Sequence, residues 1–163
     1  MVAPKPSPKP LTTVIGNLGE QLVAQWLVGQ QWQILARQWR SRWGELDLIA
    51  LEPPGTVLAF VEVKTRAGGN WDADGLLAVT PQKQARLWQT AELFLAAEPQ
   101  YAPRPCRFDL ALVTYRHARP GGTRRDRPTS PTQALPAVTL GEPLVWQGYE
   151  LTLAHYLPAA FSQ

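Results

Sequence analysis

Hydrophobic residues recur along the first part of the chain with the period of a helix. Between Gly16 and Gly29 the apolar residues are spaced by three and four positions, which predicts a helix ending at Gly29: they are Leu18, Leu22, Val23, Trp26 and Leu27. Glu20 falls inside this apolar arc, whereas Gln21 and Gln25 take the solvent side. A carboxylate at that position must be paired, solvated in a cleft or bound to a metal.

The next segments have the shorter period of strands. Residues 31–40 and 44–51 predict two strands joined by a polar turn, and residues 57–64 predict a central strand that is apolar on both faces. In the second strand, one face carries Leu46, Leu48 and Ala50, and the other carries Glu45, Asp47, Ile49 and Leu51. The two acids of this strand therefore share a face.

The second half repeats the alternation of helix and strand. After a glycine-rich loop at residues 65–79, Thr80 and Pro81 begin a helix that runs to about Ala97. Residues 106–115 predict a further strand, and residues 149–161 predict a short strand followed by a helical turn. The order predicts an α/β fold, with a mixed β-sheet flanked by helices on both faces.

Composition limits the chain to one domain. Its 163 residues are 45% hydrophobic, enough for one packed core. Proline clusters in the first ten residues, so we expect a disordered Pro/Lys arm at 1–13 and a single domain at 14–163, with a disordered Arg-rich insertion at about 116–134. The lone Cys106 fits a reducing compartment, and no apolar run approaches the ~18 residues of a membrane span, so we expect a cytoplasmic protein without a membrane partner.

Charge is unevenly placed. The net charge of +3 comes mainly from the arm and the Arg-rich insertion, and residues 11–115 are slightly acidic. A uniformly basic surface is therefore excluded as the basis of nucleic-acid binding, which would need basic arms and a local patch.

The acids of the two adjacent strands suggest a metal site. Glu62 and Lys64 share one face of their strand, so they converge with Asp47 if the strands are neighbours. Two carboxylates about 4 Å apart repel by roughly 4 kcal/mol at a dielectric of 20, which makes them a poor structural choice for an apolar strand. Mg²⁺ or Mn²⁺ takes oxygen ligands, which Asp47, Glu62 and the Val63 backbone carbonyl supply, with Glu20 as a further candidate.

Lys64 has two candidate roles. Beside carboxylates we expect an ammonium that orients water and stabilises charge on a phosphate, and proton abstraction is the weaker alternative. The non-functional alternative for Glu62 and Lys64 is an exposed ion pair on one strand. Asp109, on a core strand, we interpret as structural.

Five sequence blocks resemble a known family: GNLGEQLVAQWL, RSRWGELDLIAL, LAFVEVKTR, VTPQKQARLWQTAELFL and RFDLALV. Together they resemble the YraN-like proteins, predicted endonucleases of the restriction-endonuclease-like PD-(D/E)XK superfamily that are similar to archaeal Holliday-junction resolvases. The resemblance implies a restriction-endonuclease-like fold with Asp47, Glu62 and Lys64 at the catalytic positions and Glu20 at the resolvases' helix carboxylate. By analogy, resolution of a symmetric junction would need a homodimer.

Basic residues around these acids are candidates for phosphate contacts: Arg37, Arg40, Arg42, Arg66 and Lys83. Trp39 and Trp43 lie among the first three, and aromatic rings can stack on exposed bases. Solvated arginines over partly buried tryptophans are the ordinary alternative. We therefore expect a metal-dependent nuclease acting on DNA, including branched DNA. The alternatives are a nucleic-acid-binding module that makes no cut and an assembly protein that uses its seven tryptophans as a contact surface.

Overall fold

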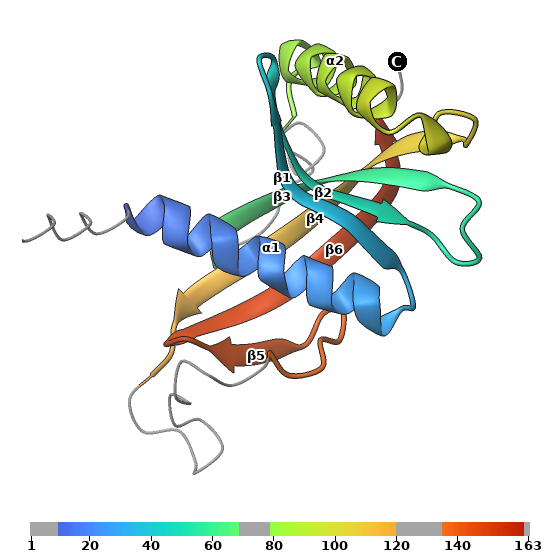
Figure 1. Cartoon of the computed structure of the whole chain (residues 1–163). Coiled ribbons are helices and arrows are strands. Elements are labelled where there is room, and N and C mark those ends of the chain that lie inside the picture. The colour runs from blue at the N-terminus through green and yellow to red at the C-terminus, as the bar shows by residue number, and fades with distance from the viewer. Residues whose placement is uncertain (1–9, 69–78, 120–134, 162–163) are drawn as a thin grey trace, which may run out of the picture.

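The computed structural model describes residues 10–68, 79–119 and 135–161, and there it has two α-helices packed on a six-stranded sheet (Figure 1). The elements in chain order are α1 (Leu11–Gly29), β1 (Gln33–Ser41), β2 (Gly44–Leu51), β3 (Leu58–Ala67), α2 (Pro81–Ala97), the short 3₁₀ helix η2 (Pro99–Tyr101), β4 (Cys106–His117), β5 (Pro143–Trp146) and β6 (Tyr149–Phe161). The predicted α/β class is confirmed. In the described part of the chain, neither helix is both long and apolar enough to span a bilayer.

The sheet is mixed, as the order of elements predicts. Its strands lie in the order β1-β2-β3-β4-β6-β5. β3 and β4 are parallel, and the other neighbours are antiparallel. Parallel neighbours require a crossover connection, and the segment between β3 and β4 contains α2. This connection brings the start of α2 near the end of β3.

Each face of the sheet has its own core, and each core belongs to one helix. The first core joins α1 to one face through buried side chains that include Leu22, Val23, Leu27, Leu48, Ala59, Val61 and Leu153. The second joins α2 to the opposite face through Leu87, Ala91, Phe94, Ile49, Leu58, Phe60 and Phe108. Residues alternate between the cores along β3, which confirms it as a central strand covered on both sides.

The first helix is longer than predicted. It begins at Leu11 rather than Gly16, so residues 11–13, which we expected in the N-terminal arm, are helical. Ile15 is buried one turn before Leu18 and extends the apolar stripe toward the N-terminus. Pro10 precedes the first turn, where a missing N–H costs no hydrogen bond. The rest of the predicted arm, residues 1–9, lies outside the described residues.

The prediction of a helical turn at the C-terminal end is wrong. Residues 149–161 form one strand, β6, which pairs with β4 along its length and with β5 over its first four residues. Pro158 lies beyond the part that β5 covers, so its missing N–H breaks no ladder there. Tertiary pairing therefore overrides the local helical tendency of this segment. The sequence also failed to predict β5, which has only four residues and starts with proline.

The ends of two strands and the position of one side chain differ from expectation. β3 extends to Ala67, into the predicted loop, and β4 extends to His117, into the predicted insertion. Residues 69–78 and 120–134 lie outside the described residues. Leu46 packs in the core on the α2 side, whereas Leu48 and Ala50 pack on the α1 side. The pairing of β2 with β3 ends at Leu48, and beyond it the β1–β2 hairpin twists independently, with Gln38 at a positive φ of 49°.

Candidate functional site

The candidate site lies where β2 and β3 separate. Their antiparallel pairing ends at the Leu48–Val61 pair, which confirms that the two acid-bearing strands are neighbours. Past this point the Val63 N–H donates to Oδ2 of Asp47 at 2.8 Å, so a carboxylate replaces the missing ladder acceptor. The N–H and C=O of one strand residue point to the same side, so the Val63 carbonyl is directed toward the β2 side as well.

Glu62 is the most buried charge of this site. Its side chain is 4% exposed, on the same side of β3 as Leu58 and Phe60. Lys64 Nζ donates to Oε1 of Glu62 at 2.8 Å, and Lys83 Nζ, from the first turn of α2, donates to the same oxygen. Burial lowers the pKa of Lys64, but the charge and hydrogen bond of Glu62 outweigh burial and raise it. Lys64 is thus held as an ammonium, as the first of its two predicted roles requires.

The surroundings of Asp47 favour the protonated form of its carboxyl group. Burial raises its pKa, and the charge of Glu62 raises it further, while the hydrogen bond from Val63 opposes both. The pKa of Asp47 reaches about 8. The surroundings of Asp47 therefore disfavour its ionised form.

Glu20 reaches the same region from α1. The helix lies close to β3 here because Gly19 has no side chain: a Cβ at Gly19 would overlap Oγ1 of Thr65. The expectation that Glu20 needs a partner holds, since Gln38 Nε2 donates to Oε2 of Glu20 at 2.9 Å and to Oδ1 of Asn17 at 2.9 Å. Partial burial raises the pKa of Glu20, and the charges of Glu45 and Glu62 add to this effect against the hydrogen bond from Gln38.

The three carboxylates do not form one coordination cluster. Among the described residues, no group of three or more His, Cys, Asp and Glu side chains is arranged to hold a metal ion. Glu20 is held by Gln38 instead of joining Asp47 and Glu62. Mg²⁺ commonly takes one or two carboxylates and keeps several waters, so Asp47, Glu62 and the Val63 carbonyl still fit as a donor set. The raised pKa of Asp47 is the observation that favours a cation there.

The basic candidates fall into different settings. Arg37 and Arg66 are exposed, at β1 and at the end of β3. Arg40 is exposed but paired with Glu45 at 2.6 Å. Arg42 lies over the ring of Trp43, with its Cζ 5.2 Å from the ring centroid. Lys83, which we expect to contact phosphate, forms an ion pair with Glu62.

The two tryptophans of the basic segment, Trp39 and Trp43, differ in their exposure to solvent. Trp39 packs edge-on against Phe94 in the core, with ring centroids 5.6 Å apart, so it cannot stack on a base. Trp43, at the turn between β1 and β2, is 44% exposed. The prediction of aromatic contacts therefore narrows to Trp43.

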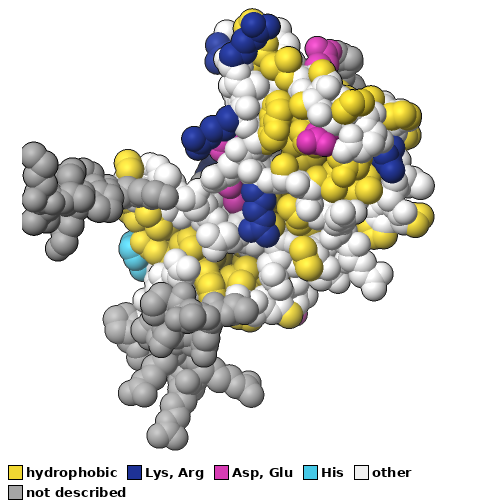
Figure 2. Space-filling model, in the orientation of Figure 1, with side chains coloured by type: hydrophobic (Ala, Val, Ile, Leu, Met, Phe, Trp, Pro, Cys, Tyr) yellow, Lys and Arg dark blue, Asp and Glu magenta, His cyan; other side chains and the backbone are white. Residues whose placement is uncertain are grey.

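Two clefts flank the tip of the β1–β2 hairpin. One, of about 400 Å³, opens between the hairpin and α1 and is lined by Thr13, Gly16, Asn17, Glu20, Gln38, Arg40 and Glu45. The other, of about 270 Å³, lies between the hairpin and α2 and includes Trp43, Lys83 and Arg86. Glu45 lines both. Figure 2 shows acidic side chains partly covered between groups of Lys and Arg above the N-terminal half of α1.

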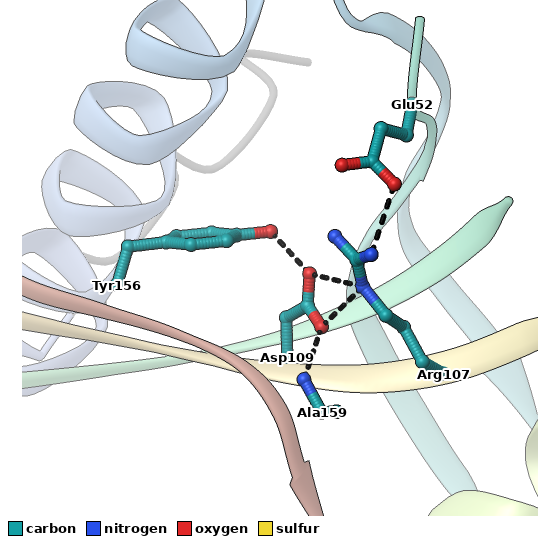
Figure 3. Close-up of polar contacts among 5 residues, drawn as sticks. All are labelled: Glu52, Arg107, Asp109, Tyr156 and Ala159. Atoms are coloured by element: carbon teal, nitrogen blue, oxygen red, sulfur yellow. Dashed lines mark hydrogen bonds and ion pairs between the residues drawn. The ribbon is translucent and has the colours of Figure 1, made fainter.

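A second polar cluster has Asp109 at its centre (Figure 3). Asp109 is fully buried, and it accepts from Arg107 Nε at 2.9 Å, from the Tyr156 hydroxyl at 2.7 Å and from the Ala159 N–H at 2.9 Å. Arg107 continues to Glu52 at 2.9 Å. Burial would lower the pKa of Arg107, but Asp109 and Glu52 raise it. Burial and the charge of Asp109 raise the pKa of Tyr156. Every charge of this cluster has a partner, as expected of a structural role.

Two site residues were not predicted in their observed roles. Gln38 has no distinguishing signal in the sequence, since it is one of several glutamines in the segment. Lys83 was singled out as a candidate phosphate contact from its place in the first turn of α2, three residues after the helix cap Thr80, and this position did not indicate its pairing with Glu62. Neither contact with a carboxylate could be read from spacing, because each joins segments about twenty residues apart.

Comparison with known proteins finds relatives along nearly the whole chain. The model of a family described as "Uncharacterised protein family UPF0102" matches residues 19–113. A UPF0102 protein of Acaryochloris marina is 44% identical and aligns over 98% of this chain and 96% of its own length. One from Synechocystis sp. is 48% identical over 91% of this chain and 98% of its own length. One from Thermosynechococcus vestitus is 56% identical over 64% of this chain and 82% of its own length.

Proposed function

The chain belongs to the UPF0102 family, and from the site at the end of β2 and β3 we propose that this member is a metal-dependent endonuclease that hydrolyses phosphodiester bonds in DNA. The proposal includes the finer assignment to the restriction-endonuclease-like PD-(D/E)XK superfamily. A mixed sheet with a helix on each face supports it, as does the Glu62-Val63-Lys64 triplet beside the acid-bearing β2.

One observation carries the proposal. Asp47, whose pKa is raised, lies beside the Lys64 ammonium, which the buried carboxylate of Glu62 holds in place. Asp47 is hydrogen-bonded to Val63 at the point where Glu62 holds Lys64. A structural ion pair would need no second acid there. Catalysis of phosphate chemistry needs this combination, because charge develops on both the attacking water and the phosphate oxygens.

The proposed cofactor is Mg²⁺ or Mn²⁺, held by Asp47, Glu62 and the Val63 carbonyl. When bound, such a cation lowers the pKa of a coordinated water and neutralises charge on the phosphate. The chain itself supplies the rest. The Lys64 ammonium donates a hydrogen bond to a phosphate oxygen or to the attacking water, and Glu62 fixes its position. Glu20, oriented by Gln38, lies at the edge of the site and accepts a hydrogen bond from water.

The proposed partner is DNA, and the basic residues around the clefts provide its contacts. Arg37, Arg40, Arg42 and Arg66 are exposed, and electrostatic attraction by such groups does not depend on base sequence. Action on a two-fold symmetric junction would need a homodimer. The lone cysteine fits activity in a reducing compartment, so we propose a cytoplasmic role.

A cleavage assay tests the proposal. The unmodified chain is incubated with Mg²⁺, Mn²⁺ or chelator and with duplex, single-stranded and four-way-junction DNA, and with RNA of the same sequence. Removing one group that stabilises transition-state charge costs about 100- to 1,000-fold in rate. We expect that loss for Asp47→Asn and for Lys64→Ala. Glu92→Gln, which removes an exposed carboxylate from α2, is the matched control and should cleave normally.

The outcomes separate the alternatives. Activity that survives both Asp47→Asn and Lys64→Ala would show that the assigned residues do not carry the reaction. Binding that ignores chelator, with no cleavage under either metal, would favour a nucleic-acid-binding module. No affinity for DNA at low salt would favour an assembly protein.

A further inference from the structure

The cleft between the hairpin and α2 is not used by the proposed reaction. It has a volume of about 270 Å³, just below the ~300–1,000 Å³ typical of small-molecule pockets. Its lining comes from two elements and includes Trp43 and Glu45 on the hairpin and Lys83, Arg86, Leu87 and Thr90 on α2. Lys83 also contacts Glu62, so the cleft adjoins the candidate catalytic carboxylates.

One wall of the cleft is an exposed tryptophan at the hairpin turn. Trp43 is 44% exposed, and its backbone N–H donates to Oγ of Ser41 at 3.0 Å. The same oxygen lies 3.2 Å from Oγ1 of Thr90, which ties the hairpin turn to α2. The guanidinium of Arg42 lies over the Trp43 ring. These hydrogen bonds fix the backbone of the turn beside α2, and the Trp43 ring on it is exposed to solvent.

The floor and the rim of the cleft differ in chemistry. Leu87 is buried at the floor, and the hydroxyl of Thr90 already donates to the Arg86 carbonyl at 2.8 Å. Of the two floor residues, Leu87 is apolar and the Thr90 hydroxyl already has a hydrogen-bond partner, so neither needs a water molecule as a partner. The rim is basic, with exposed Arg86 and partly exposed Lys83. Glu45, the acid of the lining, is neutralised by Arg40.

We propose that this cleft holds one unpaired base of the DNA strand whose phosphate lies at Asp47 and Glu62, with the base stacked on Trp43. A flat aromatic ligand suits the ring and the apolar floor, and the attached phosphates suit Arg42 and Arg86. The volume admits a single ring system and excludes a base-paired segment. The inference rests on the proposed function, and it assigns as substrates DNA with unpaired nucleotides beside the cut in preference to continuous duplex.

Binding measured without metal tests the inference separately from cleavage. The probe is a DNA oligonucleotide carrying the fluorescent base 2-aminopurine, either unpaired or within a duplex, mixed with protein in chelator at low salt. Stacking on Trp43 should quench the unpaired probe. Alanine substitution of a stacking residue costs about 1–3 kcal/mol per base, so Trp43→Ala should weaken binding of the unpaired probe about 5- to 150-fold. Binding of the duplex should change less than twofold.

Two further variants keep the test specific. Leu140→Ala removes an exposed apolar side chain near β5, at the opposite edge of the sheet, and should leave both probes within twofold. Trp43→Phe keeps a smaller ring and should retain most of the quenching. The inference is overturned if Trp43→Ala weakens both probes equally, if it weakens neither, or if the unmodified chain quenches neither. If quenching depends on Trp43 but the protein cuts no DNA, the nuclease proposal is wrong and the base-binding site is retained.

Discussion

Two buried carboxylates on neighbouring parts of one sheet, Asp109 and Glu62, have opposite surroundings. Asp109, on the α1 side, receives hydrogen bonds from three residues, and the chain of partners ends at Glu52 (Figure 3). Glu62, on the α2 side, lies beside a second acid, Asp47, whose pKa is raised to about 8. The first cluster gives every charge that it buries a charged or hydrogen-bonding partner. In the second, Glu62 is paired with Lys64 and Lys83, whereas Asp47 accepts its hydrogen bond from a backbone N–H and has no ion pair among the described residues.

This difference distinguishes a structural cluster from a functional one. A buried charge stabilises the fold only while all of its partners remain. Loss of one partner leaves the remaining charged or polar groups buried without a hydrogen bond or counter-charge. A carboxylate that is desolvated without an ion-pair partner, as Asp47 is among the described residues, lowers stability, and such a group is often found at a functional site. Four predictions follow the contrast, ordered by the size of the expected effect.

The largest effect is expected at Asp109. Asp109→Ala removes the hydrogen-bond acceptor of the Arg107 guanidinium and of the Tyr156 hydroxyl. It should therefore lower the free energy of unfolding by about 3–5 kcal/mol. Unfolding in urea, followed by circular dichroism, measures the change. Tyr156→Phe removes one hydrogen bond and should cost about 1 kcal/mol. If Asp109→Ala lowers the free energy of unfolding by no more than Tyr156→Phe does, the residues around Asp109 do not act together in stabilising the fold.

The next effect concerns how Glu20 is positioned. A Cβ at Gly19 would overlap Thr65, so Gly19→Ala should cost about 1–3 kcal/mol by overpacking. Gly16 lies one turn earlier in the same helix with open space around its Cα, so Gly16→Ala should stabilise by about 0.5–1 kcal/mol. Urea unfolding of the two variants provides the matched comparison. Equal effects would show that the close approach of α1 to β3 is unimportant.

Asp47→Asn should raise stability, in contrast to Asp109→Ala. The amide oxygen still accepts from Val63, while the cost of a buried charge beside Glu62 disappears. The folded protein holds the Asp47 proton up to a pKa of about 8, against 3.8 in the unfolded chain, so the folded state binds more protons between these values. The unmodified chain should therefore lose stability relative to the variant as pH rises from about 4 to 8.

Unfolding in chelator across this pH range measures the difference. Glu92→Gln is the control, since an exposed carboxylate should give no such trend. A variant that is less stable than the unmodified chain at pH 8 would mean that Asp47 contributes to the fold as Asp109 does.

The smallest effect is expected from added metal. At tenfold excess over its dissociation constant, Mg²⁺ should stabilise the unmodified chain by about 1.4 kcal/mol, a rise of a few degrees in melting temperature. Asp47→Asn should lose this shift, and Glu92→Gln should keep it. Thermal unfolding with and without Mg²⁺ is the measurement. A shift that persists in Asp47→Asn would place the metal elsewhere.

Local pattern predicted most of the fold. The stripe that contains Leu22 and Leu27 and the alternation along β3 identified the elements and the faces they bury, because burial repeats with the period of each element. The pattern failed at β6, where pairing with β4 decides the structure of a segment whose local signals favour a turn. It also failed at Leu46, where the hairpin leaves β3.

The sequence by itself determined that Glu62 and Lys64 share one face of their strand, because side chains alternate along a strand. It predicted that Asp47 joins them only if the two strands are neighbours, and the structure pairs these strands. Only the tertiary structure decided that Lys83 pairs with Glu62, that Gln38 holds Glu20 apart from the other acids, and that Asp109 is fully satisfied. These contacts join distant segments, and their geometry depends on strand register and on how closely each helix docks. Local periodicity carries no information about either quantity.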